Sequence, residues 1–197
     1  VSADDTSAPA PGEQRLPAWV LIAAVTAATI PLVYHAIRAA SGRWVPTGDD
    51  AYFTLRSLDV GTAHHPLLGA WSSGSADVDR QVNNLGPLQL DLLAPFTKVA
   101  WAGGTAIGVV VVHLLAIGGL AWLSHRLGGT RQVVASALGV ALMAWVLGSE
   151  MLITPRQHQF LLIPYLCLLV ATWASAAGDR WAPMVWVGAA SLVAQTH

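Results

Sequence analysis

The chain has 197 residues, of which 54% are hydrophobic and 11% are charged, and its mean hydropathy is +0.54. A soluble domain carries roughly 25% charged residues, so this chain has too little polar surface to coat a water-facing globule. The 10 Lys and Arg against 11 Asp and Glu give a formal net charge of −1, which argues against a nucleic-acid partner. The composition therefore indicates an integral membrane protein, in contact with the lipid bilayer.

Five apolar runs follow a polar N-terminal tail. Residues 1–16 are rich in Ala, Pro, Ser and Asp and lack hydrophobic periodicity, which predicts a disordered tail. A helix needs about 20 apolar residues to cross about 30 Å of hydrocarbon. We therefore expect an all-α polytopic bundle in the plasma membrane. Its spans are expected at about 17–40, 104–123, 133–153, 160–177 and 181–197. The last run is still apolar where the sequence stops, so we expect the chain to be the N-terminal portion of a longer protein.

Residues 41–103, between the first two runs, differ in composition from the rest of the chain. They hold six of the eleven acidic residues. Two amphipathic segments inside them, 51–60 and 88–99, are too short and too charged to span a membrane. They are typical of helices that lie on a membrane surface. We therefore expect a long first loop that carries two short surface helices.

The distribution of arginine predicts the orientation. The turn at 124–132 carries Arg126 and Arg131 without an acid, which favours the cytoplasm. The parity of the runs then places the N-terminus in the cytoplasm and residues 41–103 outside. Arg38 and Arg43, at the outer end of the first run, weakly favour the opposite orientation.

An acidic pair, Asp49 and Asp50, follows the first run and precedes Tyr52 and Phe53. Two carboxylates close to a bilayer are costly unless they are solvated, paired or bound to a cation. They are candidates for a general base, or for groups that organise a metal and a phosphate. The alternative is structural: one of them is the N-cap of a helix that starts at Ala51. Both interpretations can hold together.

The order of these features resembles the GT-C superfamily of membrane glycosyltransferases. Its protein mannosyltransferases carry an Asp-Glu-x-aromatic-Phe pattern after the first span, and Asp49-Asp50-Ala51-Tyr52-Phe53 is similar to it. Asp50 stands where those enzymes have Glu. Residues 65–71, 84–88 and 164–197 resemble actinobacterial multi-spanning proteins of the same group. The likeness covers most of the chain after residue 17.

The resemblance implies an inverting transfer of a sugar, in the cell envelope, from a polyprenyl-phosphate donor to an acceptor hydroxyl outside the cytoplasm. The acceptor needs a carboxylate to take its proton; Asp49 is the first candidate and Asp50 the second. The departing phosphate needs cationic donors or a divalent cation, Mg²⁺ or Mn²⁺. Arg156 and His158 are candidate donors, unless they belong to an ordinary connector. Glu150 is a candidate metal ligand, unless it is a plain interfacial carboxylate.

The remaining histidines have plainer interpretations. His64-His65-Pro66 lacks the spacing of a metal site, so we expect a loop role or an acceptor contact, with His65 and Tyr52 as substrate-binding candidates. For His35 and His113, inside apolar runs, a neutral ring bonded to a helix carbonyl is favoured over a proton relay. Two other functions remain open: a transporter or channel subunit, and a non-catalytic scaffold. We expect the 197 residues to be inactive as an enzyme by themselves.

Overall fold

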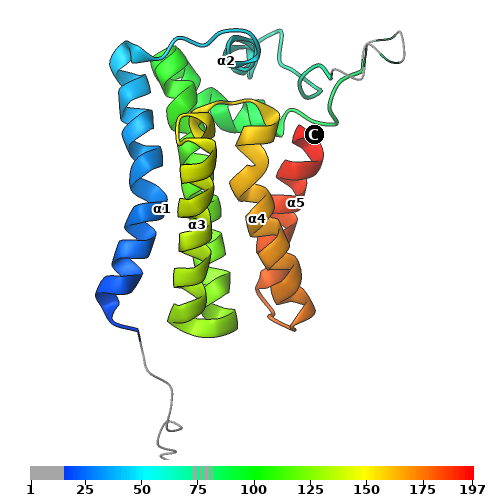
Figure 1. Ribbon diagram of the computed structural model, residues 1–197. Helices are drawn as coiled ribbons and strands as arrows, with labels where there is room; N and C mark the ends of the chain where they lie inside the picture. The colour runs from blue at the N-terminus through cyan, green and yellow to red at the C-terminus, as the bar shows by residue number, and fades with distance from the viewer. Residues whose placement is uncertain (1–15, 73–74, 76, 78–79, 81) are drawn as a thin grey trace, which may run out of the picture.

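The computed structural model describes residues 16–72, 75, 77, 80 and 82–197, and in these residues every regular element is a helix. One isolated antiparallel bridge joins Trp71 to Asn83. The elements, in the order of Figure 1, are α1 (Ala18–Arg38), η1 (Ala39–Arg43), α2 (Asp49–Asp59), α3 (Leu88–Leu147), η3 (Met151–Ile153), α4 (Gln157–Ala176) and α5 (Ala182–Thr196). The all-α prediction is confirmed. The predicted disordered tail lies outside the described residues, apart from Leu16.

Three stretches of helix are long and apolar enough to cross a membrane: Ala18–Gly42, Leu88–Leu147 and Gln157–Ala176. The chain is therefore consistent with a membrane protein. α5 has 15 residues, fewer than the roughly 20 that a span needs, so it does not meet this condition. It packs against α4 and returns to the end of the bundle that carries α2, where the C-terminus lies (Figure 1).

The 60-residue element α3 is three helical segments joined at two breaks. At the first break Trp101 has φ 45°, and at the second Gly129 has φ 63°. Glycine adopts such an angle without steric cost, which explains the second break. The segments after the breaks correspond to the predicted runs 104–123 and 133–153. The apolar run itself indicates an end at Leu147 with a possible extension to 153; the helix stops at Leu147, before a glycine with φ 80° and the short helix η3, so the extension is not helical without a break.

Small residues let α1 pack closely against α3. The buried residues of α1 recur every four positions and so share one face: Ala24, Ala28, Leu32 and Ala36. At the end of this contact a side chain on Gly103 would meet the backbone of Ala40 at 2.7 Å. Close approach over small residues is the usual way in which helices associate in lipid.

His113 lies fully buried in the second segment of α3. Its Nε2 is 3.1 Å from the carbonyl oxygen of Phe160 in α4. This contact confirms the expected buried histidine bonded to a neighbouring helix. His35 differs, because its Nδ1 lies 3.5 Å from a carboxylate oxygen of Glu150.

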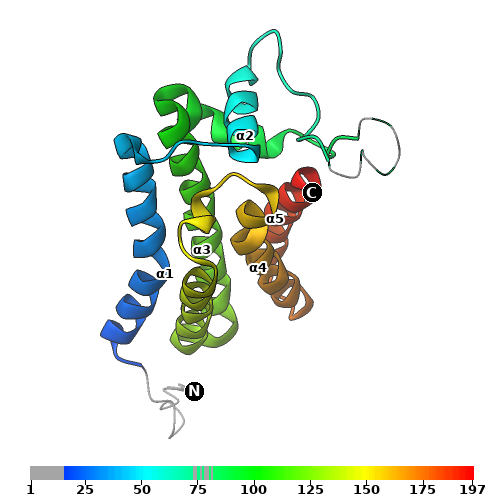
Figure 2. The ribbon, with the colours of Figure 1, turned by 45° about the horizontal axis from the view of Figure 1, so that its top comes forward.

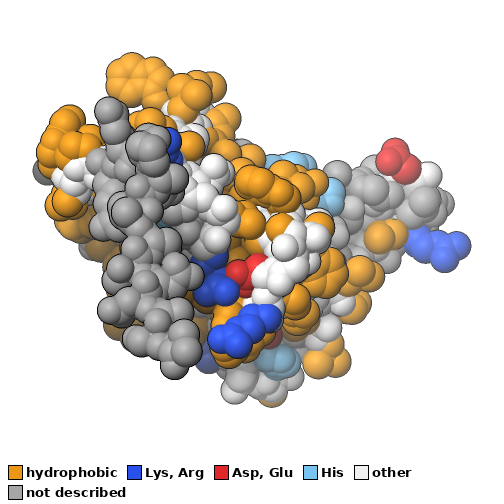
Figure 3. Space-filling view, turned by 90° about the horizontal axis from the view of Figure 1, so that it is seen from below, with side chains coloured by type: hydrophobic (Ala, Val, Ile, Leu, Met, Phe, Trp, Pro, Cys, Tyr) orange, Lys and Arg blue, Asp and Glu red, His pale blue; other side chains and the backbone are white. Residues whose placement is uncertain are grey.

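The two ends of the bundle differ. α2 lies across the end where α1 finishes and α4 begins, and the chain between α2 and α3 extends to one side (Figure 2). The opposite end, seen in Figure 3, shows a few charged side chains among hydrophobic ones. There Arg126 Nε lies 2.5 Å from Asp179 Oδ2, and Asp179 Oδ1 accepts hydrogen bonds from the backbone N–H groups of Trp181 and Ala182. Asp179 thus fixes the start of α5.

Two glycine substitutions test the packing of α3. A Cβ on Gly104 would lie 2.0 Å from the carbonyl oxygen of Phe96, whereas a Cβ on Gly118 would meet nothing within 4 Å. We expect Gly104→Ala to lower the free energy of unfolding by about 1–3 kcal/mol, as overpacking does. Gly118→Ala should leave stability unchanged or raise it by up to about 1 kcal/mol, because alanine favours a helix. Thermal unfolding followed by circular dichroism in detergent distinguishes the two; equal midpoints would contradict this packing.

Candidate active site

An ion pair joins the start of α2 to the start of α4. Arg156 Nε donates to Asp50 Oδ1 at 3.1 Å, and Arg156 Nη2 donates to Asp50 Oδ2 at 3.3 Å. The Asp50 side chain is 7% exposed and that of Arg156 is 41% exposed. Two parallel bonds between guanidinium and carboxylate fix orientation as well as distance. Residues that are 106 positions apart in sequence are thereby held together.

α2 begins at Asp49, and its N-cap is Gly48, whose φ of 55° suits glycine. No side-chain cap hydrogen bond is formed there. The prediction that an acid caps a helix starting at Ala51 is therefore wrong. Both acids lie in the first turn instead, where the helix dipole favours negative charge. This placement turns Asp50 toward α4 and leaves Asp49 exposed.

Burial raises the pKa of the Asp50 carboxyl above its ordinary value of 3.8, and the hydrogen bonds and charge of Arg156 offset part of the rise. The neighbouring charge of Asp49 adds to it. Removal of a carboxylate from water disfavours its charged form, which an adjacent guanidinium restores. Arg156 is therefore the group that opposes the rise in the pKa of this buried acid.

A cavity of about 430 Å³ lies beside the pair, within the range that small-molecule sites occupy. Asp49 and Arg156 both line it. Its other walls come from α2, from the loop after α2 and from the first turn of α4: Tyr52, Phe53, Ala70, Trp71, Gln157, His158 and Gln159. The structure thus brings together Asp49, Tyr52, Arg156 and His158 around one hollow, with Asp50 behind Arg156.

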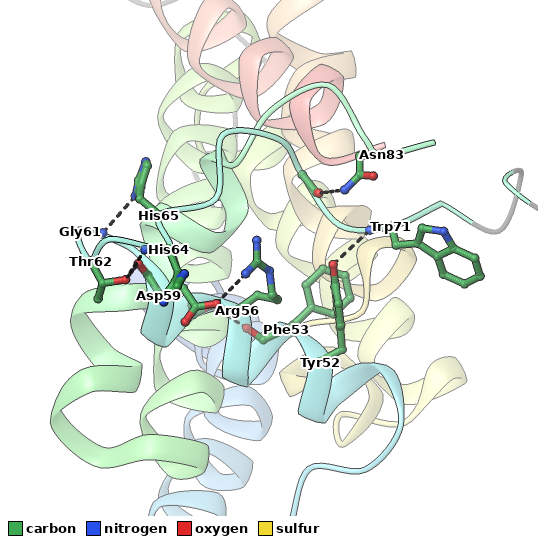
Figure 4. Close-up of polar contacts among 12 residues, drawn as sticks. Tyr52, Phe53, Arg56, Asp59, Gly61, Thr62, His64, His65, Trp71 and Asn83 are labelled. Atoms are coloured by element: carbon green, nitrogen blue, oxygen red, sulfur yellow. Dashed lines mark hydrogen bonds and ion pairs between the residues drawn. The ribbon is translucent and has the colours of Figure 1, made fainter. Parts of the chain in front are cut away.

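The aromatic wall of the cavity is held by the loop between α2 and α3 (Figure 4). The backbone N–H of Trp71 donates to the Tyr52 hydroxyl at 3.4 Å, and Tyr52 packs edge-to-face on Phe53. Asn83 Nδ2 donates to the carbonyl of Gly69 at 3.1 Å. The loop is therefore tied both to α2 and to itself.

The end of α5 supports the opposite side of the site. Asn84 Nδ2 donates to the carbonyl of Thr196 at 2.8 Å. The ring of His158 lies edge-on to that of His197, with centroids 5.3 Å apart. Gln89, in the first turn of α3, donates to the carbonyl of Pro155, the residue before Arg156. The segment that carries Arg156 is thus braced by α3 as well as by α2.

Two glutamines that line the cavity have buried polar atoms without a hydrogen-bond partner among the described residues. These atoms are Nε2 of Gln157 and Oε1 of Gln159. Buried polar groups are ordinarily paired, because an unpaired one loses its hydration without compensation. One donor and one acceptor are therefore left unpaired beside the cavity. Sequence analysis did not single them out, although their position beside Arg156 was a signal that could have done so.

Two predicted residues lie elsewhere. His65 is exposed, and its Nδ1 accepts a hydrogen bond from the backbone N–H of Gly61 at 3.0 Å (Figure 4). It shapes the turn after α2 and does not line the cavity described above. Glu150 lies beside His35 and Arg38, in a second cavity between α1 and η3.

The side chains do not fit a resident Mg²⁺ or Mn²⁺. Within the described residues no group of three or more His, Cys, Asp or Glu side chains is placed to hold a metal ion. Asp50 is engaged by Arg156, and Glu150 faces cationic groups at the other cavity. The role of Glu150 as a metal ligand stays a prediction.

Comparisons of the chain with protein-family models, with curated proteins and with solved structures find no match.

Replacement of Arg156 by Gln tests the electrostatics of the pair. The pKa of Asp50 is higher in the folded protein than in the unfolded chain, so folding favours the protonated carboxyl. The resulting gain in the free energy of unfolding is complete below pH 3.8. It is lost as the pH rises through the folded-state pKa. Loss of Arg156 should raise the pKa of Asp50 further. We therefore expect Arg156→Gln to lower the free energy of unfolding by about 1–2 kcal/mol at pH 7, a figure that allows for the exposure of Arg156, and by less at pH 4.

Denaturation midpoints at the two pH values measure this effect. Arg56→Gln is the matched control, because Arg56 pairs with Asp59 on α2, 2.6 Å away, at a partly exposed position. It should change stability by less than about 1 kcal/mol. A cost of Arg156→Gln that is no larger than that of the control, or that grows at low pH, would contradict the assignment.

Proposed function

We propose that this chain forms the catalytic end of a membrane glycosyltransferase, which moves a sugar from a polyprenyl-phosphate donor to an acceptor hydroxyl. One observation carries the proposal: an exposed carboxylate, Asp49, and a fixed guanidinium, Arg156, line the same cavity. The reaction needs an acid–base group and an anion-binding group around one sugar, and these two residues supply both.

In the proposed reaction Asp49 takes the proton of the acceptor hydroxyl as its oxygen attacks the anomeric carbon of the sugar. The bond from that carbon to the phosphate oxygen breaks, and its electron pair leaves with the lipid phosphate. Asp49 suits the base better than Asp50, because it is exposed to the cavity while Asp50 is buried and paired. A positioned base of this kind contributes roughly 10²–10⁴-fold to the rate.

Arg156 serves the leaving group in this scheme. Its Nε and Nη2 bond Asp50, which leaves the Nη1 donor for a phosphate oxygen. A preorganised cation costs no reorganisation when charge develops on the leaving group. Asp50 then acts as a positioning residue, since it holds the guanidinium without touching substrate. His158, also at the cavity, is the second donor that we propose for the phosphate.

The direction of α1 relates the proposed position of the N-terminus to the side of the membrane on which the cavity lies. α2 and the start of α4, whose residues line the cavity, lie at the end of the bundle opposite the start of α1 (Figure 1). We propose that the N-terminus is cytoplasmic and that the protein is multi-pass in the plasma membrane. The cavity then faces the extracytoplasmic side, where the acceptor is modified and where α2 lies on the outer membrane surface.

Replacement of Asp49 by Asn tests the base. We expect Asp49→Asn to lower kcat by about 10²–10⁴-fold and to leave KM for the acceptor nearly unchanged, because the amide fills the same space but accepts no proton. The assay follows transfer from a labelled polyprenyl-phosphate sugar in membranes that contain the full-length protein.

Asp59→Asn is the matched control, because Asp59 lies on the same helix, pairs with Arg56 and does not line the cavity. It should retain activity. Transfer by Asp49→Asn at the wild-type rate would show that Asp49 is not the base and would overturn the proposal in this form.

A further inference from the structure

A second cavity, of about 270 Å³, lies at the same end of the bundle between the end of α1 and η3. Three ionisable side chains line it: His35 and Arg38 from α1, and Glu150 from the turn before η3. His35 and Arg38 are three positions apart, so they project from one face of the helix. Trp44, after η1, forms a further wall. The proposed sugar transfer uses none of these residues.

The ionisable groups of this cavity lie near one another but farther apart than in a tight ion pair. Glu150 Oε1 lies 3.5 Å from His35 Nδ1 and 3.9 Å from Arg38 Nη1. Charge-assisted hydrogen bonds are about 2.7–2.9 Å long, and the Arg56–Asp59 pair on α2, at 2.6 Å, is that tight. The Glu150 side chain is 73% exposed. Both signs of charge are therefore available to a ligand.

The arrangement selects among ligands by charge. A metal ion would meet the fixed positive charge of Arg38. A purely anionic group would meet the carboxylate of Glu150. A zwitterion satisfies both, with its phosphate on Arg38 and His35 and its ammonium group on Glu150. A primary ammonium group donates hydrogen bonds to a carboxylate, whereas a quaternary one cannot.

The surroundings indicate that such a ligand comes from the bilayer. Arg38 ends the apolar stretch of α1, and its guanidinium lies over the half-exposed ring of Tyr34, 5.8 Å from the centroid. Tyr34 and Trp44 mark the level at which aromatic residues gather at membrane interfaces. Met151, which lines the cavity, is 42% exposed. An apolar surface thus borders the charged groups, as a lipid with a headgroup and acyl chains requires.

We propose that this cavity binds the headgroup of a membrane phospholipid that carries a phosphate and a primary amine, that is, a lipid of the phosphatidylethanolamine class. Its phosphate lies on Arg38 and His35, its ammonium group lies on Glu150, and its acyl chains run along the lipid-facing side of α1. This site depends only on insertion of the chain in a membrane and is independent of the proposed glycosyl transfer.

Native mass spectrometry of the full-length protein tests the site. The protein is released from detergent in the presence of equal amounts of ethanolamine, choline and glycerol phospholipids with identical acyl chains. We expect the ethanolamine lipid to be retained about fivefold over each of the others, the effect of about one additional net hydrogen bond. Equal retention of the three lipids would overturn the proposal.

Two variants separate the two halves of the headgroup. Arg38→Gln should reduce retention of the ethanolamine lipid. Glu150→Gln should abolish the preference and increase retention of the anionic glycerol lipid, a gain that misfolding does not produce. Arg56→Gln, at an ion pair outside this cavity, should behave as wild type. A preference that survives Glu150→Gln would overturn the assignment of the ammonium group.

A soluble competitor identifies the source of the ligand. Glycerophosphoethanolamine has the same headgroup but no acyl chains. At a concentration equal to that of the lipid it should not displace the lipid, because the apolar contacts are missing. Complete displacement would show a site for a soluble zwitterion and overturn the assignment to a membrane lipid.

Discussion

The ion pair between Asp50 and Arg156 is the interaction on which this end of the molecule depends. It joins a short helix near the start of the chain to the head of a helix more than 100 residues later. An ion pair with one buried member adds little net stability, but removal of one partner leaves the other charge uncompensated. The pair therefore ties the first turn of α2 to the start of α4, while Phe53 of the same helix packs with Leu90 of α3. The cavity lies between the elements that these contacts hold together.

Asp49 and Asp50 have separate environments although they are adjacent in sequence. Asp50 is buried and bonded to a guanidinium, whereas Asp49 stays exposed at the cavity. An enzyme that must accept a proton and also hold an anion needs this division of roles. The proposed lipid site differs from this ion pair. Its charged groups, Arg38 and Glu150, lie near one another but farther apart than a hydrogen bond.

Much of the fold could be predicted from the sequence, because apolar runs and glycines determine where helices form and break. The break at Gly128 and Gly129 is of this kind. The break at Ala100 and Trp101 also falls between two predicted segments, 88–99 and 104–123, although no local pattern predicts a positive φ at a tryptophan. The parity of the runs also predicts that the connector with Arg156 lies on the same side as residues 41–103, which hold the acids. Which acid is buried, and the position of Trp71, depend on contacts between distant segments that no local pattern records.

A double-mutant cycle on Asp50→Asn and Arg156→Gln tests the central interaction most directly. The free energy of unfolding is measured for the protein, the two single variants and the double variant at neutral pH. We predict that the double variant loses less free energy of unfolding than the two single variants together, by about 1 kcal/mol, because it removes both charged groups at once. Effects that add to within about 0.5 kcal/mol would show that the two residues act independently, and would contradict this account of the cavity.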